Sequence, residues 1–434
     1  MIKIINTDSI DFPIAFKSIL ARGDMQSDSV EEIVKNILKD VAQYGDEALI
    51  ESAEKFDKWI PKSINDLLIP EEDCKKAYEE LEESVKSALH FAYERIKKYH
   101  EKLKPTSWLD YEANGSILGQ KVTPVERAGI YIPGGKAVYP SSLLMNAIPA
   151  IVAGVDEIIA CTPTQNNEPN ALLLAAAYLC GVKKIYKIGG ASAIGAMAYG
   201  TNSIPKCDVI TGPGNIFVAT AKKLVYGKVN IDMIAGPSEV GVLADDSANI
   251  DFLALDLLSQ AEHDEMASCF LLTPSQELAN KAQAKIEEYL EKLPRSEISR
   301  KSIDNNSYII VCKNMDEAVD LMNKIAPEHL EISTQSPFEL LPKIKNAGAI
   351  FLGHYTPESL GDYVAGPNHT LPTGGTARFY SPLSTEHFMK KSSIIYFSKD
   401  GFQEAAAATA TIAKIEGLIA HEQSALIRIN TKGK

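Results

Sequence analysis

The chain has 434 residues, enough for two to four structural units, and its 45% hydrophobic and 23% charged content is ordinary for a water-soluble globular protein. A formal net charge of -13 lacks the basic character that a nucleic-acid-binding protein needs. Because no run of about 18 apolar residues occurs, no membrane-spanning helix is expected.

The first residues and the cysteines indicate a compartment. Residues 1–6 contain no long apolar run and no small-residue cleavage site, so no signal peptide is expected. All six cysteines are isolated, without the paired spacing of a zinc site or a disulfide framework. Cys161, which ends an apolar run, is expected to be a buried, inert thiol and not a nucleophile. We therefore expect reduced thiols and a cytoplasmic protein.

The N-terminal quarter is predicted to be scaffold. Residues 1–25 have the pattern of an arm with little core of its own. Residues 27–57 and 71–103 have a helical and highly charged pattern, so their outer faces must be solvated. No arrangement of side chains in this region suggests chemistry.

From residue 125 onwards, strand-like runs alternate with helical ones. The predicted strands are 129–132, 157–161, 184–188 and 208–211. Such alternation implies βαβ units and a parallel sheet. Glycines follow the strands, in 133–135, 189–190, 212–215 and 236–238. These loops let backbone amides approach a phosphate at the carboxyl edge of a sheet. No Gly-x-Gly-x-x-Gly fingerprint is present, so a generic glycine turn stays an equal alternative to dinucleotide binding.

The alternation continues in another unit after residue 238. Its predicted strands are 240–243, 268–272, 308–311, 330–332 and 349–352. Residues 368–384 are rich in Gly, Pro, Thr and Ser, which is typical of a long functional loop. An alanine-rich helix at 404–420 and a polar tail follow.

Gln260 and His263 stand at the end of a helical pattern that begins near Asp251. Residues three apart share one face of a helix, so an amide oxygen and an imidazole can form half of a metal shell there. Taken alone, the pair is better explained as a helix end with a capping histidine. Six of the eight histidines follow residue 260, however, which favours a site in the second half of the chain.

Glu328 and His329 are adjacent after a proline, at a predicted helix-to-strand junction. Because their ordinary pKa values lie on different sides of neutral conditions, the two side chains can divide two proton transfers. Asp362, Glu416 and His421 are further polar candidates, although each alone fits a cap or a surface residue equally well.

Several longer stretches become specific when they are taken together. They are 124–131, 212–215, 235–239, 259–264, 327–331, 366–375, and Glu416–Gly417 with His421. In these stretches the chain resembles the histidinol dehydrogenases of histidine biosynthesis, and the resemblance covers essentially the whole chain.

The resemblance implies a zinc enzyme that uses NAD twice, oxidising L-histidinol to L-histidinaldehyde and then to L-histidine. His329 matches the base that takes the alcohol proton, and Glu328 matches the residue that activates water. The zinc ligands would be Gln260, His263, Asp362 and His421, an N2O2 set that suits a borderline metal. The metal would serve mainly as a template for the substrate. The implied substrate contacts are Ser238, Gln260, His263, His329, Asp362, His369, Glu416 and His421.

For NAD, the resemblance implies contacts from Tyr131, Ser192 and Asn215. The family usually has glutamine where this chain has Ser192, whose side chain is two carbons shorter. That contact is therefore lost, made through water or supplied by a neighbour.

The resemblance also implies an α/β fold with two related, open parallel-sheet domains of incomplete Rossmann type, one inserted in the other. The predicted boundaries are a small N-terminal arm at 1–25, a zinc and catalytic domain at 26–129 and 239–383, an NAD-binding domain at 130–238, and a helical tail at 384–434. The tail is expected to embrace a partner subunit in a homodimer with shared active sites.

Two other functions compete with this interpretation. A relative of the same family could oxidise another small diol, such as a sulfonated propanediol, but Glu416, His369 and the spacing from Glu416 to His421 favour histidinol. A metal-loaded or NAD-loaded scaffold is the second alternative. A pure binding protein would not need the general bases Glu328 and His329 beside its metal.

Overall fold

The computed structural model describes residues 1–23, 28–134 and 139–430. Its chain divides into two compact units, Met1–Leu103 with Val125–Phe388 and Lys104–Pro124 with Met389–Lys434. The first unit contains two open parallel sheets, and the second carries a helical C-terminal tail. The predicted α/β class is confirmed.

One sheet of the first unit has five parallel strands in the order β6-β5-β4-β7-β8. The strands are β4 (Arg127–Tyr131), β5 (Glu157–Cys161), β6 (Lys184–Tyr186), β7 (Val209–Thr211) and β8 (Asn230–Ile231). The chain first builds outward from β4 through β5 to β6 and then returns to place β7 on the other side of β4. The topological switch point therefore lies between β4 and β7, where a ligand is expected in an open α/β sheet.

Helices cover both faces of this sheet, because its strand residues alternate between two cores. Ile159 and Cys161 belong to one core and Ala160 to the other. The first core is closed by α2 (Asp28–Tyr44), α3 (Asp46–Asp57), α8 (Gly190–Tyr199) and α9 (Ile216–Val225). The second is closed by α4 (Glu71–Glu79), α5 (Glu83–Leu103), α6 (Pro140–Ala153) and α7 (Ala171–Leu179). Helices α2 to α5, drawn from residues 26–129, thus pack on the five-stranded sheet, and the predicted domain boundaries stay a prediction.

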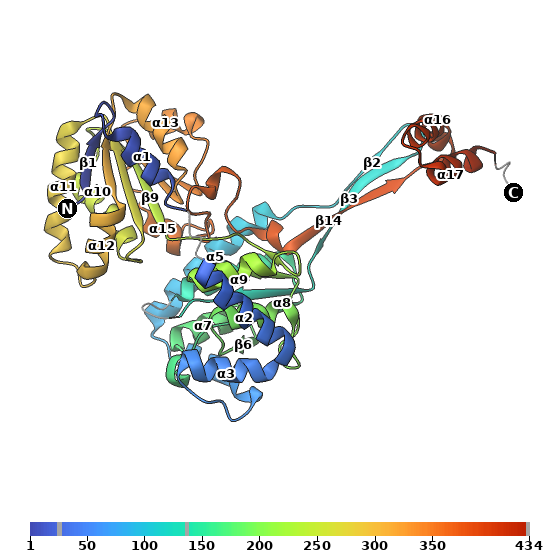
Figure 1. Ribbon diagram of the computed structural model, residues 1–434, viewed down its shortest axis with the longest axis horizontal. Coiled ribbons are helices and arrows are strands. Elements are labelled where there is room, and N and C mark those ends of the chain that lie inside the picture. The colour runs from blue at the N-terminus through green and yellow to red at the C-terminus, as the bar shows by residue number, and fades with distance from the viewer. Residues whose placement is uncertain (24–27, 135–138, 431–434) are drawn as a thin grey trace. The chain divides into compact units, whose positions relative to one another are not determined.

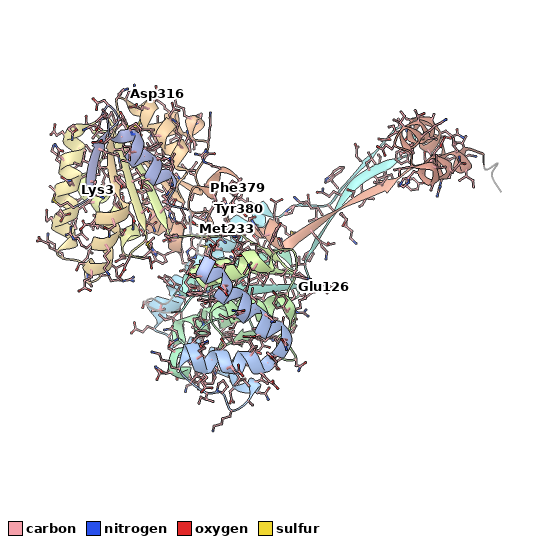
Figure 2. All side chains as sticks on the ribbon, in the orientation of Figure 1. Lys3, Glu126, Met233, Asp316, Phe379 and Tyr380 are labelled. Carbon is pink, nitrogen blue, oxygen red and sulfur yellow. The ribbon has the colours of Figure 1, made fainter. Side chains whose placement is uncertain are left out.

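The other sheet has six parallel strands in the order β1-β11-β10-β9-β12-β13. The strands are β1 (Lys3–Asn6), β9 (Glu239–Ala244), β10 (Ser268–Thr273), β11 (Tyr308–Val311), β12 (His329–Ser333) and β13 (Ala349–Leu352). Its switch point lies between β9 and β12. Strand β1 is the edge, where the amine of Lys3 lies 5.6 Å from the ring centre of Tyr308 in β11 (Figure 2).

Two further cores flank the six-stranded sheet. On one face lie α10 (Ile250–Ala261), α11 (Gln276–Leu290) and α12 (Ser296–Asn306), and on the other α1 (Phe12–Leu20) and α13 (Met315–Ile325), as Figure 1 shows. Phe16 and Ile19 of α1 are buried in the second core, so the N-terminal residues predicted as an arm also contribute to this packing.

Residues 334–388 contain short elements and the predicted long loop. The helices are α14 (Pro337–Leu340) and α15 (Glu358–Tyr363), and single 3-10 turns occur at Leu341–Lys343, Thr376–Arg378 and Thr385–Phe388. Earlier in the chain, similar turns occur at Ile64–Leu67 and Gln165–Asn167. Within the long loop the rings of Phe379 and Tyr380 lie 4.8 Å apart (Figure 2).

The second unit is an antiparallel ribbon that carries two helices (Figure 1). Strand β3 (Ile117–Pro124) pairs with β2 (Trp108–Tyr111) on one side and with β14 (Met389–Tyr396) on the other. The helices are α16 (Lys399–Ile415) and α17 (Ile419–Asn430), and Ser398 caps α16 by accepting a hydrogen bond from the amide of Gly401. None of the helices among the described residues combines the length and the apolar character that crossing a membrane requires.

Candidate functional site

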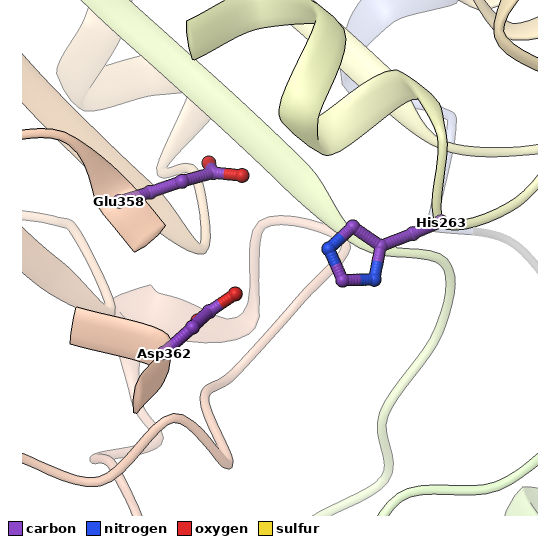
Figure 3. A group of neighbouring side chains, drawn as sticks. All are labelled: His263, Glu358 and Asp362. Carbon is purple, nitrogen blue, oxygen red and sulfur yellow. The ribbon is translucent and has the colours of Figure 1, made fainter. Parts of the chain in front are cut away.

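A histidine and two carboxylates form a potential metal-binding cluster in the first unit. His263 follows α10, while Glu358 and Asp362 lie four residues apart and therefore on one face of α15. One ligand atom from each lies within 4.8 Å of the others. Figure 3 shows the two carboxylates pointing toward the imidazole. Glu358 is buried, and the other two residues are half-buried.

Gln260 has a side-chain amide that could bind a metal and that forms no hydrogen bond. The side chain is 1% exposed, and neither its amide oxygen nor its amide nitrogen has a hydrogen-bond partner. Leaving such a group unpaired costs roughly 1–3 kcal/mol. A buried amide of this kind is therefore expected to bind a ligand. Gln260 lies in the last turn of α10, and His263 follows two residues after the end of that helix at Ala261. Together with Asp362, these residues offer nitrogen and oxygen donors that fit zinc.

Glu328 and His329 are both buried where β12 begins, and both contact the main chain of Glu239. The amide of Glu239 donates to Glu328 Oε2 at 2.9 Å, and the carbonyl oxygen of Glu239 lies 3.1 Å from His329 Nδ1. A carbonyl oxygen only accepts, so Nδ1 carries the hydrogen. In the neutral ring, Nε2 is then the basic nitrogen. Nε2 lies 3.4 Å from Asp362 Oδ1, which is an ion-pair distance without the geometry of a hydrogen bond.

Burial and charge shift the titration of these groups. Burial raises the pKa of Glu328 to about 8, although the charge of His329 and the Glu239 amide oppose this. Burial lowers the pKa of His329, but the nearby carboxylates of Glu328, Asp362 and Glu358 outweigh it and hold that pKa well above its ordinary value. Burial lowers the pKa of His263, which favours the neutral form that binds metals. Without a cation, the site therefore favours a protonated His329.

The cluster lies at the amino edge of the six-stranded sheet. Glu239 is the first residue of β9, and His329 is the first residue of β12. Helix α10 runs from the carboxyl edge back to the amino edge, which is where its last turn presents Gln260. Open α/β sheets usually bind ligands at the opposite, carboxyl edge.

The structure brings most of the predicted site residues together but not all of them. His369 Nδ1 lies 3.0 Å from the carbonyl oxygen of Asp362, and Ser238 immediately precedes Glu239. Glu416 and His421 belong to the second unit, where both are exposed, at the end of α16 and in α17. Glu358 was not predicted. Its spacing of four residues from Asp362 was the available signal.

The predicted NAD contacts lie around the switch point of the five-stranded sheet. Tyr131 ends β4, is 3% exposed, and accepts a hydrogen bond from the amide of Gly190 at 3.1 Å. A side chain at Gly212, after β7, would bring Cβ within 2.1 Å of the carbonyl oxygen of Tyr131, so only glycine fits. Asn215 is exposed and caps α9. Gly135, from one predicted glycine loop, lies outside the described residues.

Ser192 is buried in the first turn of α8. Its hydroxyl lies 2.7 Å from the hydroxyl of Ser52, which is itself buried in α3. Ser192 is therefore already hydrogen-bonded within the protein.

Known proteins resemble this chain along its length. The family model of histidinol dehydrogenase matches residues 20–429. Histidinol dehydrogenase from Wolinella succinogenes is 62% identical over 428 residues, covering 99% of each chain. The enzyme from Sulfurimonas denitrificans is 64% identical over 418 residues, covering 96% of this chain and 97% of that relative.

A solved structure agrees with the sequence relatives. The crystal structure of histidinol dehydrogenase from Elizabethkingia anophelis superposes with a TM-score of 0.93 at 35% identity, covering 99% of this chain and 98% of the other. The family match extends over both parallel sheets, apart from β1, and over most of the helical tail. The chain therefore belongs to the histidinol dehydrogenase family and is an oxidoreductase of histidine biosynthesis.

Proposed function

We propose that this chain is a zinc-dependent histidinol dehydrogenase, which performs two successive NAD-linked oxidations of L-histidinol through L-histidinaldehyde to L-histidine. One observation carries the proposal: the buried, unpartnered amide of Gln260 accompanies His263 and Asp362, beside two buried candidate bases. An exposed acidic cluster that binds nothing would have no need of the buried amide of Gln260 or of His329 Nε2, neither of which has a hydrogen-bond partner.

Gln260, His263 and Asp362 would hold the metal, with His421 as the fourth ligand. When bound, zinc would supply the positive charge that fixes and orients the substrate's nitrogen and oxygen atoms. Burial raises the pKa of Asp362, but the imidazole of His329 at 3.4 Å outweighs it and lowers that pKa overall. The Asp362 carboxylate is then ionised, as a ligand must be. A bound cation would also oppose protonation of His329 and favour its basic form.

His329 and Glu328 divide the proton transfers of the two oxidations. In the first, the substrate hydroxyl gives its proton to His329 Nε2 as the carbon that bears this hydroxyl is oxidised to the aldehyde. In the second, water adds to the aldehyde carbon and gives a proton to the Glu328 carboxylate, and oxidation of the resulting hydrate leaves the carboxylic acid. NAD, when bound, would supply the hydride acceptor, one molecule for each oxidation. Glu239 orients both bases through its main chain.

NAD would bind at the carboxyl edge of the five-stranded sheet, between the ends of β4 and β7. The glycine at 212 lets the two loops approach closely, and Tyr131 supports the first turn of α8 through Gly190. Asn215 would meet the cofactor from the start of α9. Because Ser192 is bonded to Ser52, its contact with NAD would be weaker than that of the family's glutamine, or made through water.

The homodimer is proposed from the composition of the second unit. Large apolar side chains are exposed on its helices, including Ile412 (58%), Ile415 (80%) and Ile419 (59%). Isolated exposed residues of this type are common, but several along one helical hairpin favour a protein interface. If a partner subunit covered these side chains, each subunit would supply its Glu416 and His421 to the active site of the other. His369 and Glu416 together favour histidinol over a small diol without an imidazole.

The test is to measure NADH formation from L-histidinol and NAD, against a sulfonated propanediol and simple amino alcohols, on protein of known zinc content. We expect two NADH per histidinol and little turnover of the other compounds. Preferred oxidation of the diol would overturn the substrate assignment. Full activity in demonstrably zinc-free protein would overturn the role of the metal.

A further inference from the structure

Arg22, from the N-terminal residues, contacts Glu239, the residue whose main chain meets Glu328 and His329. Arg22, just after α1, forms two parallel hydrogen bonds with the carboxylate of Glu239, Nε to Oε1 and Nη2 to Oε2, both at 2.8 Å. The exposed fractions of the two side chains are 11% and 3%. Bidentate pairing of this kind fixes orientation as well as distance.

The guanidinium of Arg22 is itself held from several sides. Its Nη1 donates to the carbonyl oxygen of Ile19 at 3.1 Å, and Nη2 also donates to that of Ile325 at 2.8 Å. The group lies 5.3 Å from the ring centre of Phe270. Lysine could not reproduce this planar, multiply bonded arrangement, because it offers a single point charge.

Glu239 connects this anchor to the chemistry. Its side chain accepts from Arg22 and, through Oε1, from the amide of Gly374 at 2.8 Å. Its main chain meets Glu328 and His329, as described above. The backbones of Gly23 and Gly374 approach so closely that a Cβ on Gly23 would lie 2.5 Å from the carbonyl oxygen of Gly374. Glu239, the first residue of β9, therefore holds together the N-terminal residues at Arg22 and the long loop at Gly374.

We propose that Arg22 and Glu239 are positioning residues for the two proton transfers. The Arg22 fork fixes the first residue of β9, and through it the carbonyl that selects the Nδ1–H form of His329 and the amide that aims Glu328. This inference rests on the proposed function, because it assigns the brace to the two bases of that reaction. Neither residue touches the substrate; both act through the main chain at Glu239.

A purely structural ion pair is the alternative, and the two can be separated. Removing a structural pair lowers stability or the fraction of folded enzyme, without changing how each remaining site titrates. Loosening the brace also weakens the hydrogen bond from the Glu239 amide to Glu328. Because that bond favours the ionised carboxylate, its loss moves the rising limb of the pH–rate profile to higher pH.

The experiment compares Arg22→Gln, Arg22→Lys and Glu239→Gln with the unsubstituted enzyme, at matched zinc content, on L-histidinol and L-histidinaldehyde separately. Arg300→Gln is the matched control, because Arg300 also makes a two-oxygen contact with a glutamate, Glu287, away from all these residues. We expect Arg22→Gln to lower kcat for both substrates by roughly 10- to 100-fold, as when outer-shell partners are removed. The KM should change by less than about threefold, since little ground-state binding is lost.

The decisive readout is the pH profile of aldehyde oxidation. Arg22→Gln should shift its rising limb upward by about half a unit or more, and Arg22→Lys, which keeps the positive charge, should give a smaller shift in the same direction. Glu239→Gln also removes a negative charge that raises the pKa of Glu328, so this variant serves for the comparison of kcat and not for the pH profile. Arg300→Gln should match the unsubstituted enzyme. Unmoved profiles in folded variants would overturn the brace while leaving the proposed function intact. Absent turnover of both substrates by the unsubstituted enzyme would overturn the proposed function, and the brace with it.

Discussion

The candidate sites on the two parallel sheets of the first unit lie at opposite edges of their sheets. The five-stranded sheet has glycine loops at the carboxyl ends of β4 and β7, where nucleotide binding is expected. In the six-stranded sheet, the potential metal cluster and both candidate bases lie at the amino ends of β9 and β12. A shared architecture therefore does not decide which edge carries the chemistry.

The carboxyl edge of the six-stranded sheet differs from that of the five-stranded sheet in its polar side chains. At its switch point, Ser333 Oγ lies 2.8 Å from His354 Nδ1, and Ser247 Oγ lies 3.2 Å from His354 Nε2. Asp245 accepts from Ser247 and from the amide of Gln335. Burial raises the pKa of Asp245, but these hydrogen bonds outweigh it and leave the carboxyl ionised at neutral pH. These polar groups already hydrogen-bond one another, and the negative charge of Asp245 would repel a phosphate, so this edge does not favour phosphate binding.

The largest expected effect comes from exchanging one histidine at each edge. His263→Asn at the amino edge should weaken zinc binding and lower turnover by on the order of 100-fold or more, since removing even an outer-shell partner costs 10- to 100-fold. His354→Asn at the carboxyl edge should keep zinc and activity within about threefold. Zinc content and NADH formation from L-histidinol are the measurements. Comparable zinc loss in both variants would remove the contrast between the edges.

A second prediction divides the amino edge itself. Glu328→Gln keeps the shape of the side chain but cannot accept a proton, so aldehyde oxidation should fall by roughly 100-fold more than alcohol oxidation if general-base catalysis is lost. His329→Asn should depress the alcohol step as well. The two substrates are supplied separately, and NADH formation is followed for each. Equal losses on both substrates in Glu328→Gln would leave that residue a structural partner.

The third prediction asks whether a site is completed from another subunit. His421→Ala and His329→Ala should each be inactive alone, while hybrid dimers of the two should regain one intact site in two. Recovery would be about half of the unsubstituted activity, because one hybrid pairs both intact residues in a single site. Tagged, purified hybrids provide the measurement. Inactive hybrids of confirmed composition would mean that each subunit builds its own site.

The smallest effect concerns the five-stranded side, where an acid affects stability and not chemistry. Burial raises the pKa of Asp57 to about 6, against a hydrogen bond from Gln165. Protonation therefore favours the folded state, and this contribution is complete below about pH 4 and is lost as the pH rises through about 6. Asp57→Asn should raise Tm at pH 7.5 by about 2–4 °C and change it little at pH 4. Asp40→Asn, exposed on α2, is the control, and an equal gain there would point to net charge.

Local patterns were enough for much of the fold and part of the site. The apolar run 240–243 predicted β9 to within one residue at each end, because strands buried on both faces are continuously apolar. The three-residue spacing of Gln260 and His263 was also a local signal, although α10 ends at Ala261 and His263 lies in the turn that follows. Helical and strand periodicity act over a few residues, and these features depend on nothing else.

Features made by distant contacts could not be found this way. Glu358 joins His263 only because α15 packs back toward α10, and Arg22 meets Glu239 across 217 positions of sequence. The ribbon of β2, β3 and β14 was not predicted, because every residue of β2 is exposed and its strands bury no regular apolar face. The proposed relation of His421 to the metal cluster would depend on another subunit, which a single chain cannot encode in its spacing.

The pairing of β1 with β11 has a consequence for the order of assembly during synthesis. Lys3 is synthesised 305 residues before its partner, Tyr308. At about 5–20 residues per second, roughly 15–60 seconds pass before that partner exists. Strands β9 and β10 can pair before then, whereas β1 waits, and α1 and Arg22 follow it in sequence. The contacts that Arg22 makes with Ile325 and that Glu239 makes with Gly374 cannot form before those residues are made, so this group of contacts is completed after β9 and β10 can pair.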